Sequence, residues 1–217
     1  MRKVIFANEE VYHIYNRGVE KRMIIEDVTD AERFLQSMVE FNTLNPIGSI
    51  YEKKSHEKSF GKVVIKDEEK EEPLVEVIAY CINPNHFHFI LRQVSDKGVE
   101  KFMQRFGTGY TMYFNKKYTR SGSLFQGTFK AIHIETNEYL LHLSAYVNLN
   151  FRVHRYEDDI LTRSSWNEYI GKTKREYCEK NIVLGQFRSQ EEYKDFSESS
   201  LIGILERKQI ERALLME

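Results

Sequence analysis

The chain has 217 residues, 41% of them hydrophobic, and its 32 basic and 33 acidic residues leave a formal net charge of −1. This length and apolar content can bury one core and leave a small appendage, so we expect one domain and a tail. No apolar run approaches the roughly 20 residues of a membrane-spanning helix, and residues 1–10 turn acidic before a signal-peptide core could form. We therefore expect a cytoplasmic protein with no membrane partner.

The first half of the chain predicts a strand, a helix and a pair of strands. Side chains alternate over residues 11–17, and apolar residues recur at helical spacing over 29–44, with Thr29 or Asp30 as the cap. Residues 45–73 lose periodicity and become polar, which indicates a solvated connection with a short strand at 63–65 as an option. Strands over 74–82 and 86–94 follow, joined by a tight turn.

The second half predicts a long helix over 97–117, a strand over 128–135 and a helix over 137–150 capped by Thr136. The order βαββαβ followed by a helix predicts an α+β fold: a ferredoxin-like antiparallel sheet with helices on one face. Further on, Ser189 and Glu192 have the spacing of a helix-capping box. We divide the chain into a domain over 1–156 and a C-terminal helical extension over 157–217.

Two histidines stand two residues apart in Pro84-Asn85-His86-Phe87-His88-Phe89-Ile90. On a strand, residues i and i+2 point to one face, so His86 and His88 project together and form half of a metal site. Such a pair is also compatible with a partly solvated strand face or two hydrogen-bonded histidines. A zinc site shared with Cys81 is a further option, but it lacks a fourth ligand at a recognised spacing. The only other cysteine, Cys178, is distant in sequence, so no disulfide framework is indicated.

Tyr146 and Asn150 are four residues apart in the helix predicted over 137–150, so they lie on one face of it. That face presents a phenol and a side-chain amide together. The plainer interpretation is a boundary aromatic followed by a residue of the helix end. His142 lies one turn before Tyr146 and is either a proton carrier or a structural residue.

Four ordered motifs between residues 10 and 155 give the chain a family resemblance. They are Tyr12-His13-Ile14-Tyr15-Asn16-Arg17-Gly18, Ala79-Tyr80-Cys81-Ile82-Asn83-Pro84-Asn85-His86-Phe87-His88, Arg120-Ser121-Gly122-Ser123-Leu124-Phe125-Gln126-Gly127 and Tyr146-Val147-Asn148-Leu149-Asn150. Together they resemble the single-tyrosine HUH transposases, in particular the REP-associated tyrosine transposases. The chain departs from the common pattern at Phe151, where the family often has proline, and at Thr128, where a basic residue is common.

The resemblance implies a metal-dependent DNA transposase that cleaves and rejoins single-stranded DNA at hairpin-bearing ends through a 5′-phosphotyrosine intermediate. His86, His88 and Asn150 would hold a divalent cation, Mg²⁺ or Mn²⁺, and Tyr146 would be the nucleophile. Members of this family also form dimers that exchange the tyrosine helix, so a homodimer is an option. DNA contacts are expected at Tyr12, Asn16, Arg17, Lys116, Lys117 and Arg120.

The distribution of charge agrees with a nucleic-acid partner. Between Lys101 and Ile134 the chain has six basic residues and no acidic one. Phosphate binding depends on such local potential and not on total charge. Two alternatives remain open: a domesticated descendant that binds hairpin DNA or structured RNA without cutting it, and a metal-dependent hydrolase that uses water as its nucleophile.

Overall fold

Five antiparallel strands form a single sheet in the order β4-β1-β3-β2-β5. The structure is a computed structural model, and it describes residues 4–51, 72–156 and 159–214. The optional strand at 63–65 lies outside the described residues. The strands are β1 (Val11–Arg17), β2 (Val75–Asn83), β3 (His86–Gln93), β4 (Lys130–His133) and β5 (Arg163–Ser164). The first four confirm the predicted ferredoxin-like sheet, and β5 adds an edge strand beside β2.

Two helices cover one face of the sheet, α1 (Val28–Glu40) and α3 (Gly98–Lys117). Their apolar sides meet the sheet in an aromatic core that includes Phe34, Phe87, Phe89, Phe102, Phe106 and Tyr110. Helix α1 begins earlier than predicted because Asp27 is its cap: the Asp27 side chain accepts from the Asp30 amide, and the Asp30 side chain accepts in return. A short 3₁₀ turn, η1 (Val19–Lys21), follows β1.

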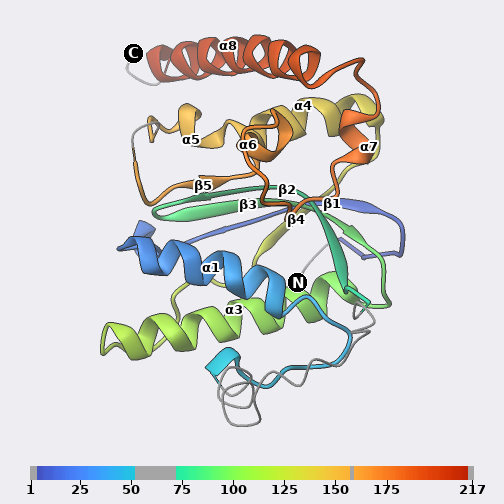
Figure 1. Cartoon of the computed structure of the whole chain (residues 1–217). Helices are drawn as coiled ribbons and strands as arrows, with labels where there is room; N and C mark the ends of the chain where they lie inside the picture. The colour runs from blue at the N-terminus through green and yellow to red at the C-terminus, as the bar shows by residue number, and fades with distance from the viewer. Residues whose placement is uncertain (1–3, 52–71, 157–158, 215–217) are drawn as a thin grey trace.

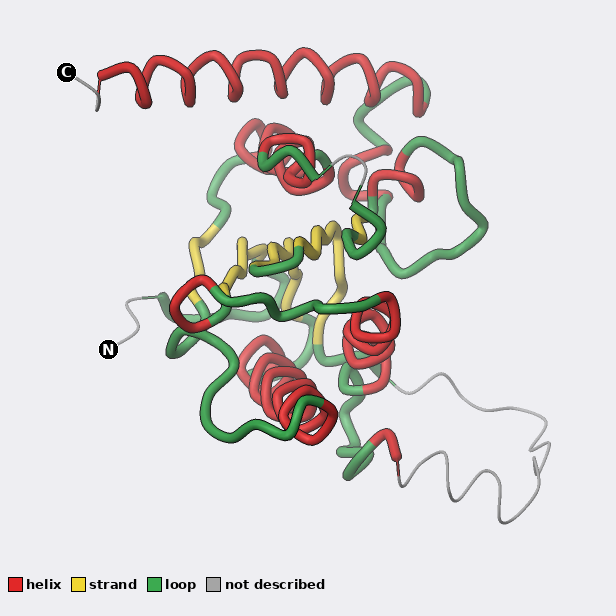
Figure 2. The backbone as a smooth tube through the Cα atoms, turned by 90° about the vertical axis from the view of Figure 1, so that its left-hand side faces the viewer, coloured by secondary structure: helices red, strands yellow, loops and turns green. Residues whose placement is uncertain are grey.

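The opposite face carries the tyrosine-bearing helix α4 (Asn137–Asn148), with Thr136 as its N-cap as predicted. The polypeptide bends at Leu149 and continues as the short α5 (Asn150–Val153). Two further short helices, α6 (Trp166–Tyr169) and α7 (Asn181–Leu184), and the long α8 (Gln190–Leu214) complete this side. Figures 1 and 2 show the sheet between two helical layers, with α8 outermost above α4. In the part of the chain that is described, no helix has the length and apolar character to cross a bilayer.

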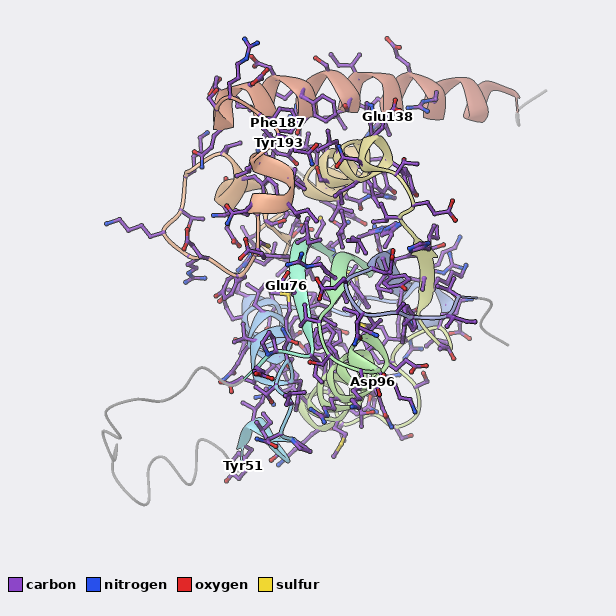
Figure 3. All side chains as sticks on the ribbon, turned by 90° about the vertical axis from the view of Figure 1, so that its right-hand side faces the viewer. Tyr51, Glu76, Asp96, Glu138, Phe187 and Tyr193 are labelled. Atoms are coloured by element: carbon purple, nitrogen blue, oxygen red, sulfur yellow. The ribbon has the colours of Figure 1, made fainter. Side chains whose placement is uncertain are left out.

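The C-terminal segment shares the core of the first 156 residues. Tyr169 and Tyr193 are fully buried with Ile78, Ile90 and Val147 in the cluster between the sheet and α4. Figure 3 shows Phe187 and Tyr193 together beneath the start of α8, and their rings are 5.2 Å apart. The division at residue 156 remains a prediction, and the contacts show that the segment after it completes the second layer.

Helix α3 runs without a break through Gly107 and Gly109, although glycine weakens a helix. The two positions differ in their surroundings. A Cβ atom built on Gly109 would lie 2.4 Å from the Phe41 ring, whereas a Cβ on Gly107 would meet nothing within 4 Å. Phe41 is itself buried, so its ring has little room to move. Gly109 therefore permits the close approach of the segment that follows α1.

This contrast predicts opposite effects of one substitution at two neighbouring helical positions. Gly107→Ala should raise the free energy of unfolding by up to about 1 kcal/mol, because alanine has the higher helix propensity. Gly109→Ala should lower it by about 1–3 kcal/mol through the clash with Phe41. Urea denaturation of the two variants measures both values. Equal stabilisation by both substitutions would show that Phe41 does not restrict this turn of the helix.

Candidate functional site

Strand pairing aligns the polar side chains of four strands on the face beneath α4. Arg17 on β1, His86 on β3 and Asn83 on β2 are directly opposite one another in the register. Two residues along, a second row runs from Lys130 through Tyr15 and His88 to Cys81. Because side chains on directly paired residues share a face, the two rows form one polar surface.

Asn150 reaches the first row from the start of α5. Its side-chain Oδ1 lies 3.1 Å from His86 Nε2, and it accepts a hydrogen bond of 2.8 Å from Asn83 Nδ2. Asn83 Nδ2 also lies 2.9 Å from His86 Nε2, so the buried Asn83 amide contacts both His86 and Asn150. Asn83 is in turn fixed by the Cys81 thiol, which donates to its Oδ1 at 3.7 Å.

The donor set fits a divalent cation. His86 Nδ1 is 2.6 Å from Asn85 Oδ1, an acceptor, so the ring proton lies on Nδ1 and Nε2 keeps its lone pair. Two acceptors, Nε2 and Asn150 Oδ1, then face each other at the separation of about 3 Å expected for adjacent ligands of a small octahedral ion. Among the described residues no three histidine, cysteine or carboxylate side chains converge. The candidate ligands are therefore two imidazoles, His86 and His88, and the amide of Asn150.

His88 belongs to a stack of three rings. Its ring is 5.1 Å from that of His13 and 5.6 Å from that of Tyr15, in nearly parallel planes. His88 Nδ1 lies 2.9 Å from His13 Nε2. His13 is only 6% exposed, and burial lowers its pKa to about 4, so it is neutral at physiological pH. The Lys130 ammonium lies over the outer face of Tyr15, 5.9 Å from the ring centre.

Tyr146 stands beside the second histidine. The Tyr146 ring meets the His88 ring edge-on, with ring centres 5.6 Å apart. Both residues belong to the same chain. Burial raises the pKa of the Tyr146 phenol, and the neighbouring Asn150 side chain partly offsets this effect. Asn150 Nδ2 is buried and makes no well-formed hydrogen bond within the described residues. The phenol, both imidazoles and the amide oxygen thus lie close together, and their roles remain predictions.

Helix α4 is held on its own sheet by a buried polar network. The Tyr193 hydroxyl, from α8, lies 3.0 Å from Ser144 Oγ and accepts from Asn148 Nδ2 at 2.8 Å. Asn148 Oδ1 accepts from Ser165 Oγ, and that hydroxyl also accepts from the Tyr80 amide of β2. Residues before and after Tyr146 are therefore connected to α8 and to the sheet.

A cleft of about 490 Å³ opens above the two histidines. It is lined by Tyr15, Asn16, Arg17, Lys21, Asn85, His86, His88, Gln126, Lys130, His154 and Tyr156. Tyr146 is not part of the lining and reaches the cleft through its contact with His88. Three cationic side chains and His154 face the same space, so the cleft suits an anionic ligand such as a phosphodiester.

The predicted DNA contacts separate into two groups. Asn16 and Arg17 line the cleft. Lys116 is on a different groove and lies over Tyr51, while Arg120 is held in its own loop by Asn115 and the Ser123 carbonyl. The Lys117 ammonium is bonded to Asp27 and Asp30 at 2.6 and 2.7 Å. Its charge is therefore compensated within the protein.

The surroundings of Tyr12 and His142 argue against two further expectations. Tyr12 is 1% exposed, and its hydroxyl donates to the Ile5 carbonyl and accepts from the Ala7 amide, so its ring is not available to DNA. His142 faces α8, where it contacts Ser200 and Phe196. We therefore assign it a structural role. For the zinc alternative, burial raises the pKa of the Cys81 thiol to about 12, which disfavours the thiolate that zinc requires.

Sequence reasoning missed several residues of the site: His13, Asn83, Asn85, Lys130 and His154. The signal for Asn83 and Asn85 was their place in the turn before His86, where they were interpreted only as turn formers. His154 lies one turn beyond Asn150 and packs on His86 with ring centres 4.5 Å apart. His13 and Lys130 are on other strands, and only the register brings them to the histidines.

Comparison with known proteins gives one family match. Residues 50–150 match the family model described as "Transposase IS200 like". None of the curated proteins compared with the chain matches it. One similar solved structure is described as a REP-associated tyrosine transposase bound to a REP hairpin. It has 10% sequence identity and a TM-score of 0.48, and the alignment covers 83% of this chain and 97% of that one.

The network around α4 predicts a stability effect of one hydroxyl. Tyr193→Phe should lower the free energy of unfolding by about 1–3 kcal/mol, because it leaves the buried Asn148 amide without an acceptor. Tyr139→Phe is the matched control: this tyrosine of α4 is 40% exposed, and its substitution should change stability by less than about 0.5 kcal/mol. Urea denaturation followed by circular dichroism measures both. Equal values would exclude the network as a source of stability.

Proposed function

We propose that the chain cleaves and rejoins single-stranded DNA with Tyr146 as nucleophile. The match of residues 50–150 to the IS200-like transposases, which are DNA-cleaving enzymes, supports this proposal. One observation carries this proposal: within one chain the Tyr146 phenol lies against His88 while Asn150 Oδ1 lies 3.1 Å from His86 Nε2. The proposed nucleophile and the proposed cation ligands are therefore adjacent, which supports the proposal.

The proposed reaction is a transesterification. The Tyr146 phenol loses its proton and its oxygen attacks the phosphorus, forming a tyrosyl ester with the 5′ phosphate. The bond from phosphorus to the 3′ oxygen breaks, and that oxygen takes up a proton and leaves as a 3′ hydroxyl. Because the ester keeps the phosphate activated, attack by a 3′ hydroxyl reverses the step without a nucleotide cofactor.

The residues around the cleft have distinct proposed roles. Arg17 and Lys130 bind and orient the phosphodiester, because they flank the histidines from β1 and β4. Tyr15, stacked between Lys130 and the histidines, offers a ring edge to an unpaired base. Burial of Tyr146 keeps the phenol protonated at neutral pH, so it is not ionised before the substrate arrives.

His86, His88 and Asn150 would hold a divalent cation, Mg²⁺ or Mn²⁺. Such an ion supplies Lewis-acid polarisation of a phosphate oxygen when it is bound. Asn83 and Asn85 keep the ligand atoms of Asn150 and His86 oriented, and both are fixed by the β2–β3 turn.

We propose that the tyrosine acts on the phosphate bound by its own histidines. The Tyr193, Ser144, Asn148 and Ser165 side chains hold α4 on the sheet of the same chain, which favours this arrangement over a dimer that exchanges the helix. The proposed substrate is a single strand with an adjacent hairpin, because an unpaired phosphate can bend into the cleft more easily than one held in duplex.

Covalent capture tests the nucleophile. Incubation with labelled hairpin-bearing single strands from the genomic flanks and Mn²⁺ should give a protein–DNA adduct on a denaturing gel. Tyr146→Phe should abolish the adduct and leave DNA binding intact, because it removes only the attacking oxygen. Tyr139→Phe should not affect it. An adduct formed by Tyr146→Phe would assign the reaction to another tyrosine, and binding without any wild-type adduct would favour a domesticated binder.

A mixture of two inactive variants tests the arrangement of the helix. Tyr146→Phe and His86→Ala each lack one half of the site. If α4 stays on its own sheet, the mixture should form no adduct. Recovery of activity would show that subunits exchange the tyrosine helix.

The salt dependence of binding tests the cleft. Arg17→Gln and Lys130→Gln should each flatten the plot of log affinity against log salt, by about 0.7 units for each phosphate that the side chain neutralises in the wild type. Lys116→Gln is the control, because Lys116 lies on the groove beside Tyr51. A flatter slope for Lys116→Gln alone would place the DNA along α3.

A further inference from the structure

Among the described residues, His13 is a buried imidazole that contacts His88 and has no part in the proposed reaction. It lies on β1 opposite Ile90, among the apolar residues between the sheet and α4. Its Nε2 lies 2.9 Å from His88 Nδ1, and its own Nδ1 is buried without a hydrogen bond in the part of the chain that is described. A hydrocarbon side chain here would avoid the unsatisfied Nδ1 of His13 but would remove the partner of His88 Nδ1. The contact with His88, and not packing, therefore explains an imidazole at this position.

The contact between His13 Nε2 and His88 Nδ1 requires a proton on one of these two nitrogens. A hydrogen bond across the 2.9 Å gap needs a proton on one of the two facing nitrogens, so one ring donates and the other accepts. If His88 donates from Nδ1, its Nε2 keeps the lone pair. If His13 donates from Nε2, the proton of His88 moves to its Nε2 and blocks that atom as a ligand.

His86, the first histidine of the pair, also has a hydrogen-bond partner beside its Nδ1. His86 Nδ1 donates to Asn85 Oδ1 at 2.6 Å, which leaves His86 Nε2 unprotonated. Histidines that bind metals generally donate their second ring N–H to such a partner, which fixes the tautomer and orientation of the ring. Asn85 is this partner for His86. For His88, the residue in the same position beside Nδ1 is His13.

We propose that His13 is a positioning residue that accepts the Nδ1 proton of His88 and so holds His88 in the tautomer whose Nε2 can bind a cation. This inference rests on the proposed function, because it assigns His13 to the same cation site. His13 touches neither the substrate nor the cation. The stack of its ring with Tyr15, 4.9 Å apart, keeps the acceptor in the plane of the contact.

Two substitutions separate the hydrogen bond from the packing. His13→Phe keeps a planar ring in the stack and removes the acceptor. His13→Gln loses the ring and keeps an amide oxygen that can accept at a similar reach. Mn²⁺ binding, measured by electron paramagnetic resonance of the free ion, should weaken about 10- to 100-fold in His13→Phe and only a few-fold in His13→Gln. Thermal unfolding of both variants checks that the fold is retained.

The tautomer itself is observable without any cation. In protein labelled with ¹⁵N at histidine, the His88 signals should show a protonated Nδ1 and an unprotonated Nε2 in the wild type. In His13→Phe the proton should shift toward Nε2. A wild-type His88 protonated at Nε2, or Mn²⁺ binding in His13→Phe equal to that of the wild type, would overturn the role of His13.

Failure of the proposed cation site gives a different result. If wild-type protein and His86→Ala bind Mn²⁺ equally, the site over the paired histidines is not a cation site, and the proposed metal dependence is wrong. The nitrogen signals of His88 still decide whether His13 sets its tautomer.

Discussion

The antiparallel register of β3 with its two neighbours is the constraint on which the site depends. A slip of one residue would turn His86 and His88 into the aromatic core and bring Phe87 and Phe89 under α4, because side chains alternate between the faces. The β2–β3 connection prevents this slip. Only Pro84 and Asn85 lie between the strands, the Pro84 carbonyl accepts from the amides of Ile24 and Ile25, and the Asn85 carbonyl accepts from the Gly18 amide.

The two faces of this sheet differ in chemistry. Phe87 and Phe89 pack with α1 and α3, where apolar burial stabilises the fold. His86 and His88 face α4, where both ring nitrogens of His86 and Nδ1 of His88 have neighbours that limit their protonation or orientation. A stretch of alternating histidine and phenylalanine thus serves a rigid core with one side and a chemical site with the other. The cost is a set of buried polar groups that must be satisfied locally.

Local patterns predicted the strands and the capped helix, and they marked the paired histidines and the Tyr146–Asn150 pair, whose roles came from the family resemblance. The alternation at residues 86–89 and the spacing of Tyr146 and Asn150 are properties of single elements, so they can be read without knowing the fold. What could not be read is how elements face one another. Lys130 joins the site only through the pairing of β4 with β1, and Lys117 leaves it because Asp27 and Asp30, about 90 residues earlier, lie within reach of its ammonium. The burial of Tyr12, a predicted DNA contact, could not be read for a related reason. Alternation tells which residues share a face but not which face is solvated.

The hydrogen bonds between α4 and Tyr193, which lies much later in the chain, have a consequence for biosynthesis. Tyr193 follows Tyr146 by 47 positions and closes the hydrogen-bond network on Ser144 and Asn148. During translation the sheet, the histidines and the tyrosine are all synthesised before this contact can form, and chains fold progressively from the N-terminus. The nascent protein therefore passes through a stage in which the hydrogen bonds of Ser144 and Asn148 to Tyr193 have not yet formed. Once the start of α8 is available, Tyr193 completes the hydrogen bonds that hold the helix of Tyr146 on the sheet of the same chain.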